Sequence, residues 1–273
     1  MKNLLFLITA LVLSASLFVV TPVSGQISEP EVQKVSGEST TLSEHYRRGL
    51  GINVVMNNFG FGVGGEYRRI IAPQSEFTTS LRITGLRDVS EQTFTDFFFG
   101  QQIIPNKFQR AIAFPLMLGL RQRVFANNIQ NDFRFFVSAS MGPSVAFSYP
   151  YFDDRNGNGY REQFQDYFEP VNDMFTGIGE GDWHLGAAGV FKIALDIGSN
   201  FARMSSIEFG YFFFYYPDAI QIMMPNQPIF RDNVAQGENP LVIIDGELAV
   251  EPFFESQKFF GSPQITFTFG WLR

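Results

Sequence analysis

Residues 261–273 read Gly-Ser-Pro-Gln-Ile-Thr-Phe-Thr-Phe-Gly-Trp-Leu-Arg. From Ile265 to Trp271, large apolar side chains occupy the odd positions, and small or polar residues occupy the even positions between them. Successive side chains of a β-strand point to opposite faces of the sheet, so this alternation predicts a strand. The strand has one bulky apolar face and one slim polar face.

The same alternation recurs upstream and predicts eight strands. Their expected ranges are 46–58, 60–71, 76–87, 109–125, 132–149, 183–197, 204–217 and 258–272. In 132–149 the odd positions are mostly large and apolar, whereas the even positions are mostly Ser, Gly and Ala. Residues 241–250 read as a short hairpin around Asp245-Gly246, which makes a ten-stranded barrel the alternative to eight strands.

Alternation alone does not say which face is inside. A soluble, lipocalin-like carrier would turn the apolar face inward, whereas a membrane barrel would turn it toward lipid. The slim polar face suits a narrow lumen, and each strand exceeds the roughly 9–11 residues that cross a bilayer when tilted. The chain has 33 Phe among 273 residues, yet its mean hydropathy is only +0.01. We therefore predict an all-β, antiparallel, up-and-down transmembrane β-barrel of the bacterial outer membrane.

The lengths of the connections support this orientation. With the N-terminus in the periplasm, the periplasmic connections at 72–75, 126–131 and 198–203 are short. The connections at 88–108, 150–182 and 218–257 are long and are expected to be extracellular loops. Short periplasmic turns and long extracellular loops are typical of outer-membrane barrels. The first connection, 57–60, is the exception because it is tight.

The chain is expected to have three parts. Residues 1–25 have a basic start, an apolar run and a small-residue cleavage site, which predicts a signal peptide; a retained anchor is the alternative. Residues 26–45 are polar and acidic and are interpreted as a flexible periplasmic N-terminal extension. The barrel then spans 46–273. The absence of cysteine excludes thiol catalysis and disulfides.

Two further stretches carry a family resemblance. Residues 114–121, Phe-Pro-Leu-Met-Leu-Gly-Leu-Arg, and residues 135–145, Phe-Phe-Val-Ser-Ala-Ser-Met-Gly-Pro-Ser-Val, are similar to two strands of the PorT-like outer-membrane β-barrel family of Bacteroidetes-type bacteria. Gly49-Leu50-Gly51-Ile52-Asn53 resembles the opening strand of that family, which is related in architecture to the OmpX and OmpA barrels. The resemblance implies a barrel with a non-enzymatic envelope or export-accessory role.

Several charged residues fall on the predicted inner faces of the strands. They are Glu66, Arg68, Arg82, Arg121, Arg123, Arg134, Lys192, Asp196 and Glu208. The lumen of an eight-stranded barrel is only wide enough for side chains to fill it, which favours a salt-bridged plug. The alternative is a path for ions or small solutes. The aromatic run 211–216, with Trp183 and Trp271, is interpreted mainly as an interface girdle, although Phe212 and Phe214 fall on the lumen face.

The long loops suggest a ligand and partners. Asp154, Asn156 and Asn158, followed by Gly159 and Glu162, fit the start of a calcium loop, although the twelfth position is not Glu. Residues 151–182 hold eight carboxylates against two arginines, and 218–257 hold seven against one, so each has a net charge of −6. This charge favours divalent-bridged contact with lipopolysaccharide, or a cationic partner, over nucleic acid.

Catalysis is the least favoured reading. Asp182, His184 and Ser148 are expected near one another at the outer rim, as in outer-membrane lipid-modifying enzymes, but no nucleophile motif accompanies them. We therefore expect a monomeric, non-enzymatic protein that contacts outer-membrane lipid and is inserted by the barrel-assembly machinery. A porin-like small-solute channel is the first alternative, and a lipid-modifying enzyme is the second.

Overall fold

The computed structural model describes residues 46–273, except 96–101, 127–128, 130–131, 165–166, 174, 199, 233 and 235–238. The expected signal peptide at 1–25 and the expected extension at 26–45 lie outside the described residues. In the part of the chain that is described, no helix has the length and hydropathy that crossing a membrane requires.

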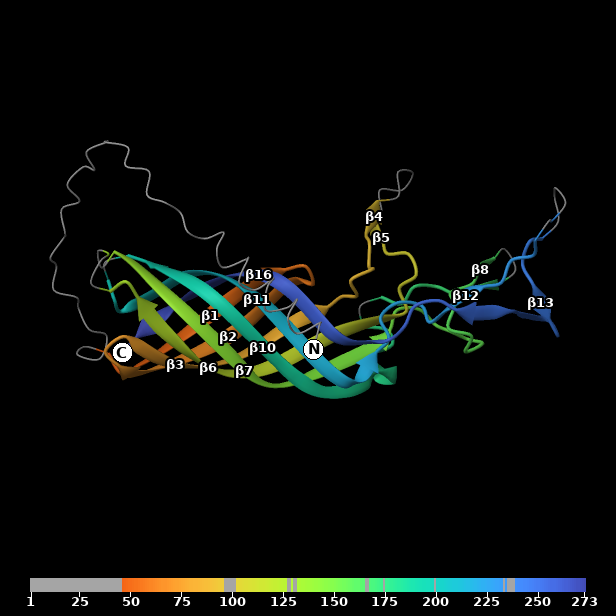
Figure 1. Ribbon diagram of the computed structural model, residues 1–273. Helices are drawn as coiled ribbons and strands as arrows, with labels where there is room; N and C mark the ends of the chain where they lie inside the picture. The colour runs from red at the N-terminus through yellow and green to blue at the C-terminus, as the bar shows by residue number, and fades with distance from the viewer. Residues whose placement is uncertain are drawn as a thin grey trace, which may run out of the picture. The chain divides into compact units, whose positions relative to one another are not determined.

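Eight long antiparallel strands form one closed barrel (Figure 1). They are β1 (Arg48–Asn57), β2 (Gly60–Ala72), β3 (Ser75–Leu86), β6 (Gln109–Val124), β7 (Phe133–Pro150), β10 (Asp182–Ile197), β11 (Arg203–Ile220) and β16 (Gln257–Leu272). Each strand pairs with the barrel strands before and after it, and β1 pairs with β16 to close the ring. The predicted up-and-down barrel of eight strands is confirmed.

Short elements occur within the long connections. They are β4 (Phe94–Thr95), β5 (Gln102–Ile103), β8 (Gln163–Phe164), β9 (Tyr167–Phe168), the 3-10 helix η1 (Ile178–Glu180), β12 (Asn226–Pro228), β13 (Ile243–Ile244), β14 (Glu247–Leu248) and β15 (Val250–Pro252). The hairpin expected at 241–250 is the pair β13–β14, which forms its own sheet outside the barrel. Its turn residues Asp245 and Gly246 have φ of 54° and 90°, as a type I′ turn requires.

The barrel turns its bulky apolar side chains outward. Leu50 is 67 % exposed, Phe61 73 % and Trp271 67 %, and the apolar outer positions of the other strands follow the same pattern. Inward positions hold mainly small, polar or charged residues, because eight strands enclose little space. Gly119 illustrates how tight the interior is, since a Cβ there would lie 2.0 Å from Ser140 Oγ. The inside–outside assignment from the sequence is therefore correct.

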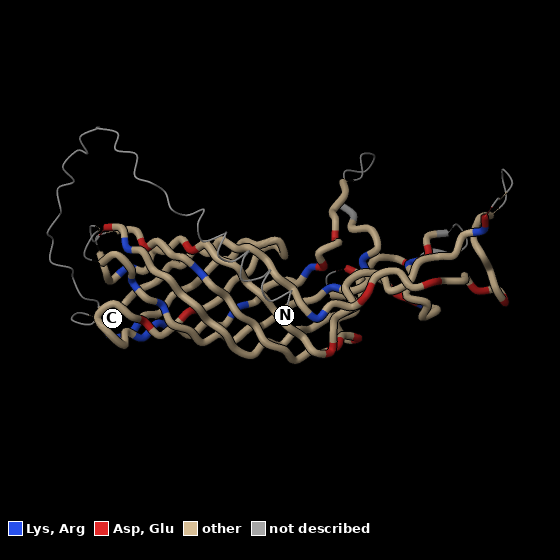
Figure 2. The backbone as a smooth tube through the Cα atoms, viewed as in Figure 1, with Lys and Arg blue, Asp and Glu red and all other residues tan. Residues whose placement is uncertain are grey.

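The two ends of the barrel differ in their connections. The links β2–β3, β6–β7 and β10–β11 are short, and we call their end of the barrel the short-turn end. The links β3–β6, β7–β10 and β11–β16 are long and leave from the opposite, long-connection end. The tight turn Asn58–Phe59 also lies at the long-connection end, and Gly60 after it has a φ of 114°. In Figure 2, Asp and Glu recur along the long connections, whereas both signs of charge occur within the barrel.

Candidate functional site

Ten charged side chains fill the lumen from its middle to the short-turn end, and we call them the charge layer. Nine are the residues expected from the alternation, and each is at most 5 % exposed: Glu66, Arg68, Arg82, Arg121, Arg123, Arg134, Lys192, Asp196 and Glu208. The tenth is Glu76 on β3, which is 1 % exposed and was missed in the sequence. Its signal was available, because Glu76 shares the even-numbered face of β3 with Arg82.

Arg68 is at the centre of the charge layer. Its Nε lies 2.6 Å from Glu66 Oε1, and its Nη2 lies 3.5 Å from Glu208 Oε1. Its Nη1 lies 3.8 Å from Glu76 Oε2 and 3.9 Å from Asp196 Oδ2. These carboxylates come from β2, β11, β3 and β10, so one guanidinium connects strands from opposite sides of the barrel.

Arg121 extends the network from β6. Its Nη1 donates to Glu76 Oε2 at 3.0 Å, and its Nη2 donates to Asp196 Oδ1. Asp196 also accepts a hydrogen bond from Ser206 Oγ at 2.5 Å. A buried ion pair is stable only when further hydrogen bonds satisfy its remaining atoms, and here each acid of the pair is shared between partners.

The other cations of the charge layer have either an acid or an aromatic neighbour. Lys192 Nζ donates to Glu208 Oε2, and Arg134 Nη1 donates to the carbonyl of Gly198 at 2.7 Å. Three guanidinium groups lie over rings: Arg82 over Phe212, and Arg123 and Arg134 over Phe201. Such cation–π contacts strengthen when the cation and the ring are buried, as these side chains are.

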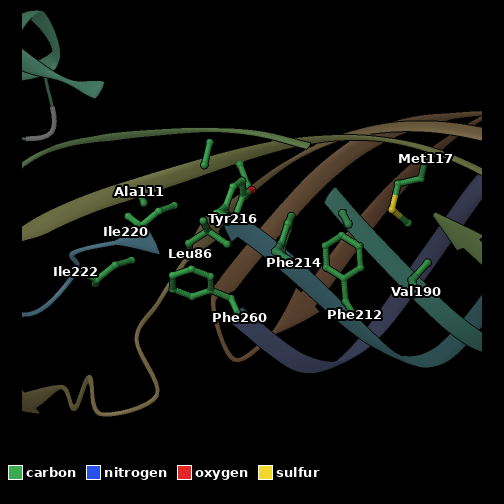
Figure 3. Close-up of a cluster of buried hydrophobic side chains, with 13 residues drawn as sticks. Leu86, Ala111, Met117, Val190, Phe212, Phe214, Tyr216, Ile220, Ile222 and Phe260 are labelled. Carbon is green, nitrogen blue, oxygen red and sulfur yellow. The ribbon is translucent and has the colours of Figure 1, made fainter. Parts of the chain in front are cut away.

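Above the charge layer, toward the long-connection end, the lumen is filled by apolar side chains (Figure 3). This apolar layer consists of Leu86, Ala111, Ala113, Met117, Ala146, Ala188, Val190, Phe212, Phe214, Tyr216, Ile220, Ile222 and Phe260. The rings of Phe212 and Phe214 meet edge to face at 4.5 Å between centroids. The hydroxyl of Tyr216 forms a 2.8 Å hydrogen bond with Ser144 Oγ, so its polar atom is satisfied.

The apolar layer corrects part of the girdle interpretation. Only the odd residues of 211–216 point outward, and Tyr211, Phe213 and Tyr215 are 50 %, 40 % and 47 % exposed. Phe212 and Phe214 face the lumen as expected, and Tyr216 joins them there rather than in a girdle. The strand continues beyond these rings to Ile220.

Together, the two layers fill the lumen with buried side chains. Four surface cavities stand out among the described residues, and none is lined by a residue of the charge layer. A solute would have to displace both the aromatic packing and the ion-pair network to pass through. This arrangement favours the predicted plug over a path for solutes.

The predicted calcium residues lie together in the β7–β10 connection. Asp154 Oδ2 accepts the Gly159 N–H at 2.9 Å, and Gly159 has a φ of 71°. The side-chain nitrogens of Asn156 and Asn158 both donate to Glu162 Oε1 at 2.9 Å. The oxygens of the two asparagines accept backbone N–H groups within the turn. The loop is therefore held by its own hydrogen bonds.

Glu169 completes this loop, and sequence reasoning missed it. Its Oε1 accepts the Arg155 N–H at 3.0 Å and its Oε2 accepts the Glu162 N–H at 2.9 Å. The residue is fully buried, and burial raises the pKa of its carboxyl group above the usual value. Among the described residues, no three His, Asp or Glu side chains form a group able to hold a metal ion. Calcium binding at 154–162 stays a prediction.

The possible catalytic group forms only in part. Ser148 Oγ lies 2.9 Å from His184 Nε2, on the neighbouring strands β7 and β10. Asp182 is exposed, and it pairs in register with Ser148 rather than contacting the imidazole. Ser148 is 1 % exposed, which leaves its hydroxyl little access to a substrate. This geometry is a buried serine–histidine hydrogen bond and lacks the third member of a triad.

Buried polar contacts also hold the long connections together at the mouth. Glu91 Oε1 accepts from Arg87 Nε at 2.9 Å and from Lys107 Nζ at 2.8 Å, and burial lowers the pKa of Lys107. Asn226 donates to the carbonyl of Asn158 at 2.7 Å, which joins the last long connection to the middle one. The outer surface is therefore a built structure rather than three independent loops.

Comparisons with known proteins give only distant likenesses. No family model matches the chain, and no curated protein matches it. Three solved structures are similar over 82 % of the chain. They are Ail, the attachment invasion locus protein of Yersinia pestis (6 % identity, 93 % of its chain, TM-score 0.33), the N-terminal β-barrel domain of Pseudomonas aeruginosa OprF (8 %, 99 %, 0.31) and Neisserial surface protein A (7 %, 93 %, 0.31). The scores are low, and we draw nothing from them. Membership of the PorT-like family stays a prediction.

Proposed function

We propose that this protein is an integral, non-enzymatic barrel of the bacterial outer membrane that presents its long connections as an interaction surface. The observation that carries the proposal is the inverted barrel, which has apolar side chains outside and a buried charge layer inside. A soluble protein would leave that apolar outer face in contact with water, which is unfavourable over so large an area. The hydrocarbon core of a bilayer is the environment in which this apolar outer face is favourable.

Strand length and connection length support the same orientation. The barrel strands have 10 to 18 residues, enough for a tilted crossing of a bilayer. With the short-turn end in the periplasm, the long connections face the cell exterior, as they do in outer-membrane barrels generally. The aromatic outer residues near both ends then lie at the membrane–water interfaces.

The closed lumen favours an interaction role over transport. A channel needs a continuous polar path, whereas this lumen is blocked by one charged and one apolar layer. The long connections are acidic, and their described parts are joined by hydrogen bonds, which suits a cationic partner or divalent-bridged lipopolysaccharide. An accessory role in export, as implied by the PorT-like resemblance, is compatible with such a surface.

Two measurements on one preparation test the proposal. Protein extracted from outer membranes should run at different mobilities on a gel before and after boiling, because a closed barrel resists detergent until heated. Reconstituted into planar bilayers, it should give no nanosiemens-scale steps. A soluble protein without a mobility shift would overturn the membrane assignment, and stable large steps would replace the interaction role with the channel.

The Ser148–His184 contact is the one specific observation that favours an enzyme. A His184→Ala variant should leave the lipid profile of the outer membrane unchanged. Loss of a modified lipid species in that variant, with normal barrel mobility, would establish the enzymatic alternative.

A further inference from the structure

An apolar groove lies outside the lumen at the short-turn end. It has a volume of about 610 Å³ and crosses β2, β1 and β16. It is lined by Arg48, Gly49, Leu50, Gly51, Ile52, Tyr67, Phe269, Trp271 and Arg273. Gly49 and Gly51 contribute only backbone to the groove, because a Cβ at either position would meet Met204 on the lumen side. The outward side chains of Leu50, Ile52 and Trp271 stand in the groove at 66–67 % exposure.

Exposed arginines gather at the same end of the same strands. Arg48 and Arg69 are direct cross-strand partners on β1 and β2. Arg203 on β11 is the partner of Trp271 on β16. Arg273 follows β16 and donates its N–H to the carbonyl of Arg48 at 2.6 Å. These four residues, Arg48, Arg69, Arg203 and Arg273, are all exposed, and we call them the arginine rim.

This cluster of like charge has no Asp or Glu partner among the described residues. None of the ion pairs between described side chains involves the arginine rim, and no Asp or Glu side chain lines the groove. Like charges directly opposite each other in adjacent strands destabilise a sheet, as Arg48 and Arg69 do here. An anion that bridges them would remove the repulsion and would form charge-assisted bonds with planar guanidinium groups.

We propose that the groove and the arginine rim bind one anionic phospholipid from the periplasmic leaflet. The inference rests on the proposed function, since the groove faces lipid only if the barrel spans the outer membrane. The arginine rim takes the headgroup phosphate, and Leu50, Ile52 and Phe269 take the first part of an acyl chain. Anionic lipids bind where a basic cluster at the membrane surface contacts the headgroup and an adjacent apolar groove contacts the acyl chain.

Native mass spectrometry of the full-length mature protein in detergent tests this assignment. Phosphatidylglycerol and phosphatidylcholine with identical acyl chains would be titrated separately. We expect phosphatidylglycerol adducts at lower lipid concentration, and a double variant Arg48→Gln/Arg273→Gln should weaken this binding by about fivefold for each arginine removed. The matched control is Arg155→Gln/Arg231→Gln, which removes the same charge from the long connections and should bind like the parent.

The gel mobility of each variant separates the possible failures. If the double variant keeps its heat-dependent shift and still binds phosphatidylglycerol like the parent, the lipid site is wrong while the membrane barrel stands. Equal binding of both lipids by the parent would also overturn the site. Complete displacement of phosphatidylglycerol by inorganic phosphate would mean that the groove contributes nothing and that a free anion is the ligand. If the parent protein itself shows no heat-dependent mobility shift, the proposed membrane barrel is wrong, and the lipid site fails with it.

A second variant probes the groove without touching charge. Ile52→Ser keeps the arginine rim and shortens the apolar wall, so it should weaken binding of long-chain phosphatidylglycerol more than binding of a short-chain form. Equal weakening of both, or none, would contradict the acyl-chain part of the assignment.

Discussion

The guanidinium carbon of Arg121 lies 3.4 Å from the centre of the Phe136 ring. The same guanidinium binds Glu76 and Asp196, so one buried side chain combines a cation–π contact with two ion pairs. Replacing Arg121 by Met leaves those two carboxylates buried with fewer partners. We expect a loss of roughly 3–5 kcal/mol in unfolding free energy. Urea unfolding in detergent, followed by gel mobility, measures it.

The matched control for that change is Arg155→Met. Arg155 forms an ion pair with Asp153 in which both side chains are 55 % exposed. Water and salt screen such a pair, so its loss should cost under about 1 kcal/mol. Equal effects of the two substitutions would mean that the charge layer does not hold the barrel together.

The apolar layer gives a prediction about conductance. The double variant Phe212→Ala/Phe214→Ala removes two fully buried rings and should lower stability by several kcal/mol, at roughly 3–5 for each ring. It should still give no large conductance steps in a planar bilayer, because the charge layer below remains in place. Large steps in this variant would show that the apolar layer alone seals the barrel.

Two adjacent glycines in β2 provide an internal comparison. A Cβ at Gly64 would lie 2.5 Å from the carbonyl of Leu81 and 2.7 Å from Arg82 Cγ, whereas a Cβ at Gly65 meets nothing within 4 Å. Gly64→Ala should therefore destabilise the barrel by roughly 1–3 kcal/mol. Gly65→Ala should be near neutral. The heating temperature at which the folded gel band disappears ranks the two, and the opposite ranking would contradict the lumen register.

Calcium binding can be tested by melting the protein with EDTA and with excess calcium. We expect calcium to raise the melting temperature of the protein by binding in the β7–β10 connection. Binding requires the side chains of Asn156 and Asn158 to turn their oxygens toward the ion. Asp154→Asn should abolish the response, whereas Asp153→Asn, an exposed neighbour, should retain it. Identical melting with EDTA and with calcium would leave the loop as a hydrogen-bonded turn.

Buried Glu169 predicts a pH dependence of the same connection. Because burial raises its pKa in the folded loop above the ordinary value of 4.5, the folded loop binds a proton more tightly than the unfolded loop does. The contribution of the Glu169 carboxyl group to the stability of the folded loop is fully present below pH 4.5 and falls as the pH rises through the raised pKa. Hydrogen exchange of residues 154–162 should therefore quicken over that window. A Glu169→Gln variant should lose the dependence, and an unchanged profile would exclude Glu169 as its source.

The strands and their inward and outward faces could be predicted because apolar and polar side chains alternate with a period of two residues. All eight barrel strands lie within a few residues of their expected ranges. The odd or even position of a residue in its strand indicated which side it faces, and the nine charged residues expected in the lumen are buried there. Glu76 was missed because it lies at the start of β3, where a charged residue is equally compatible with the preceding turn. Its inward orientation follows once Arg82 is placed on the same face.

The apolar layer and Glu169 depend on contacts that no local pattern records. The sequence predicts an interface position for Tyr216 because residues 211–216 are aromatic on both faces of the strand. Its burial depends on Leu86, Phe260 and Ile222, which come from other strands and from a long connection. Glu169 supplies a carboxylate to a turn that begins 15 residues earlier, and the fixed spacing of a calcium motif does not anticipate that distance.

The pairing of β1 with β16 has a consequence for assembly. These strands lie at opposite ends of the barrel sequence, so the ring cannot close until all intervening strands are available. Until then both strands present unpaired N–H and C=O groups, the kind of edge on which chains aggregate. Contacts between such distant segments also form slowly. We therefore predict that the unfinished barrel needs a partner that covers both edge strands, and that pairing of β1 with β16 releases this partner.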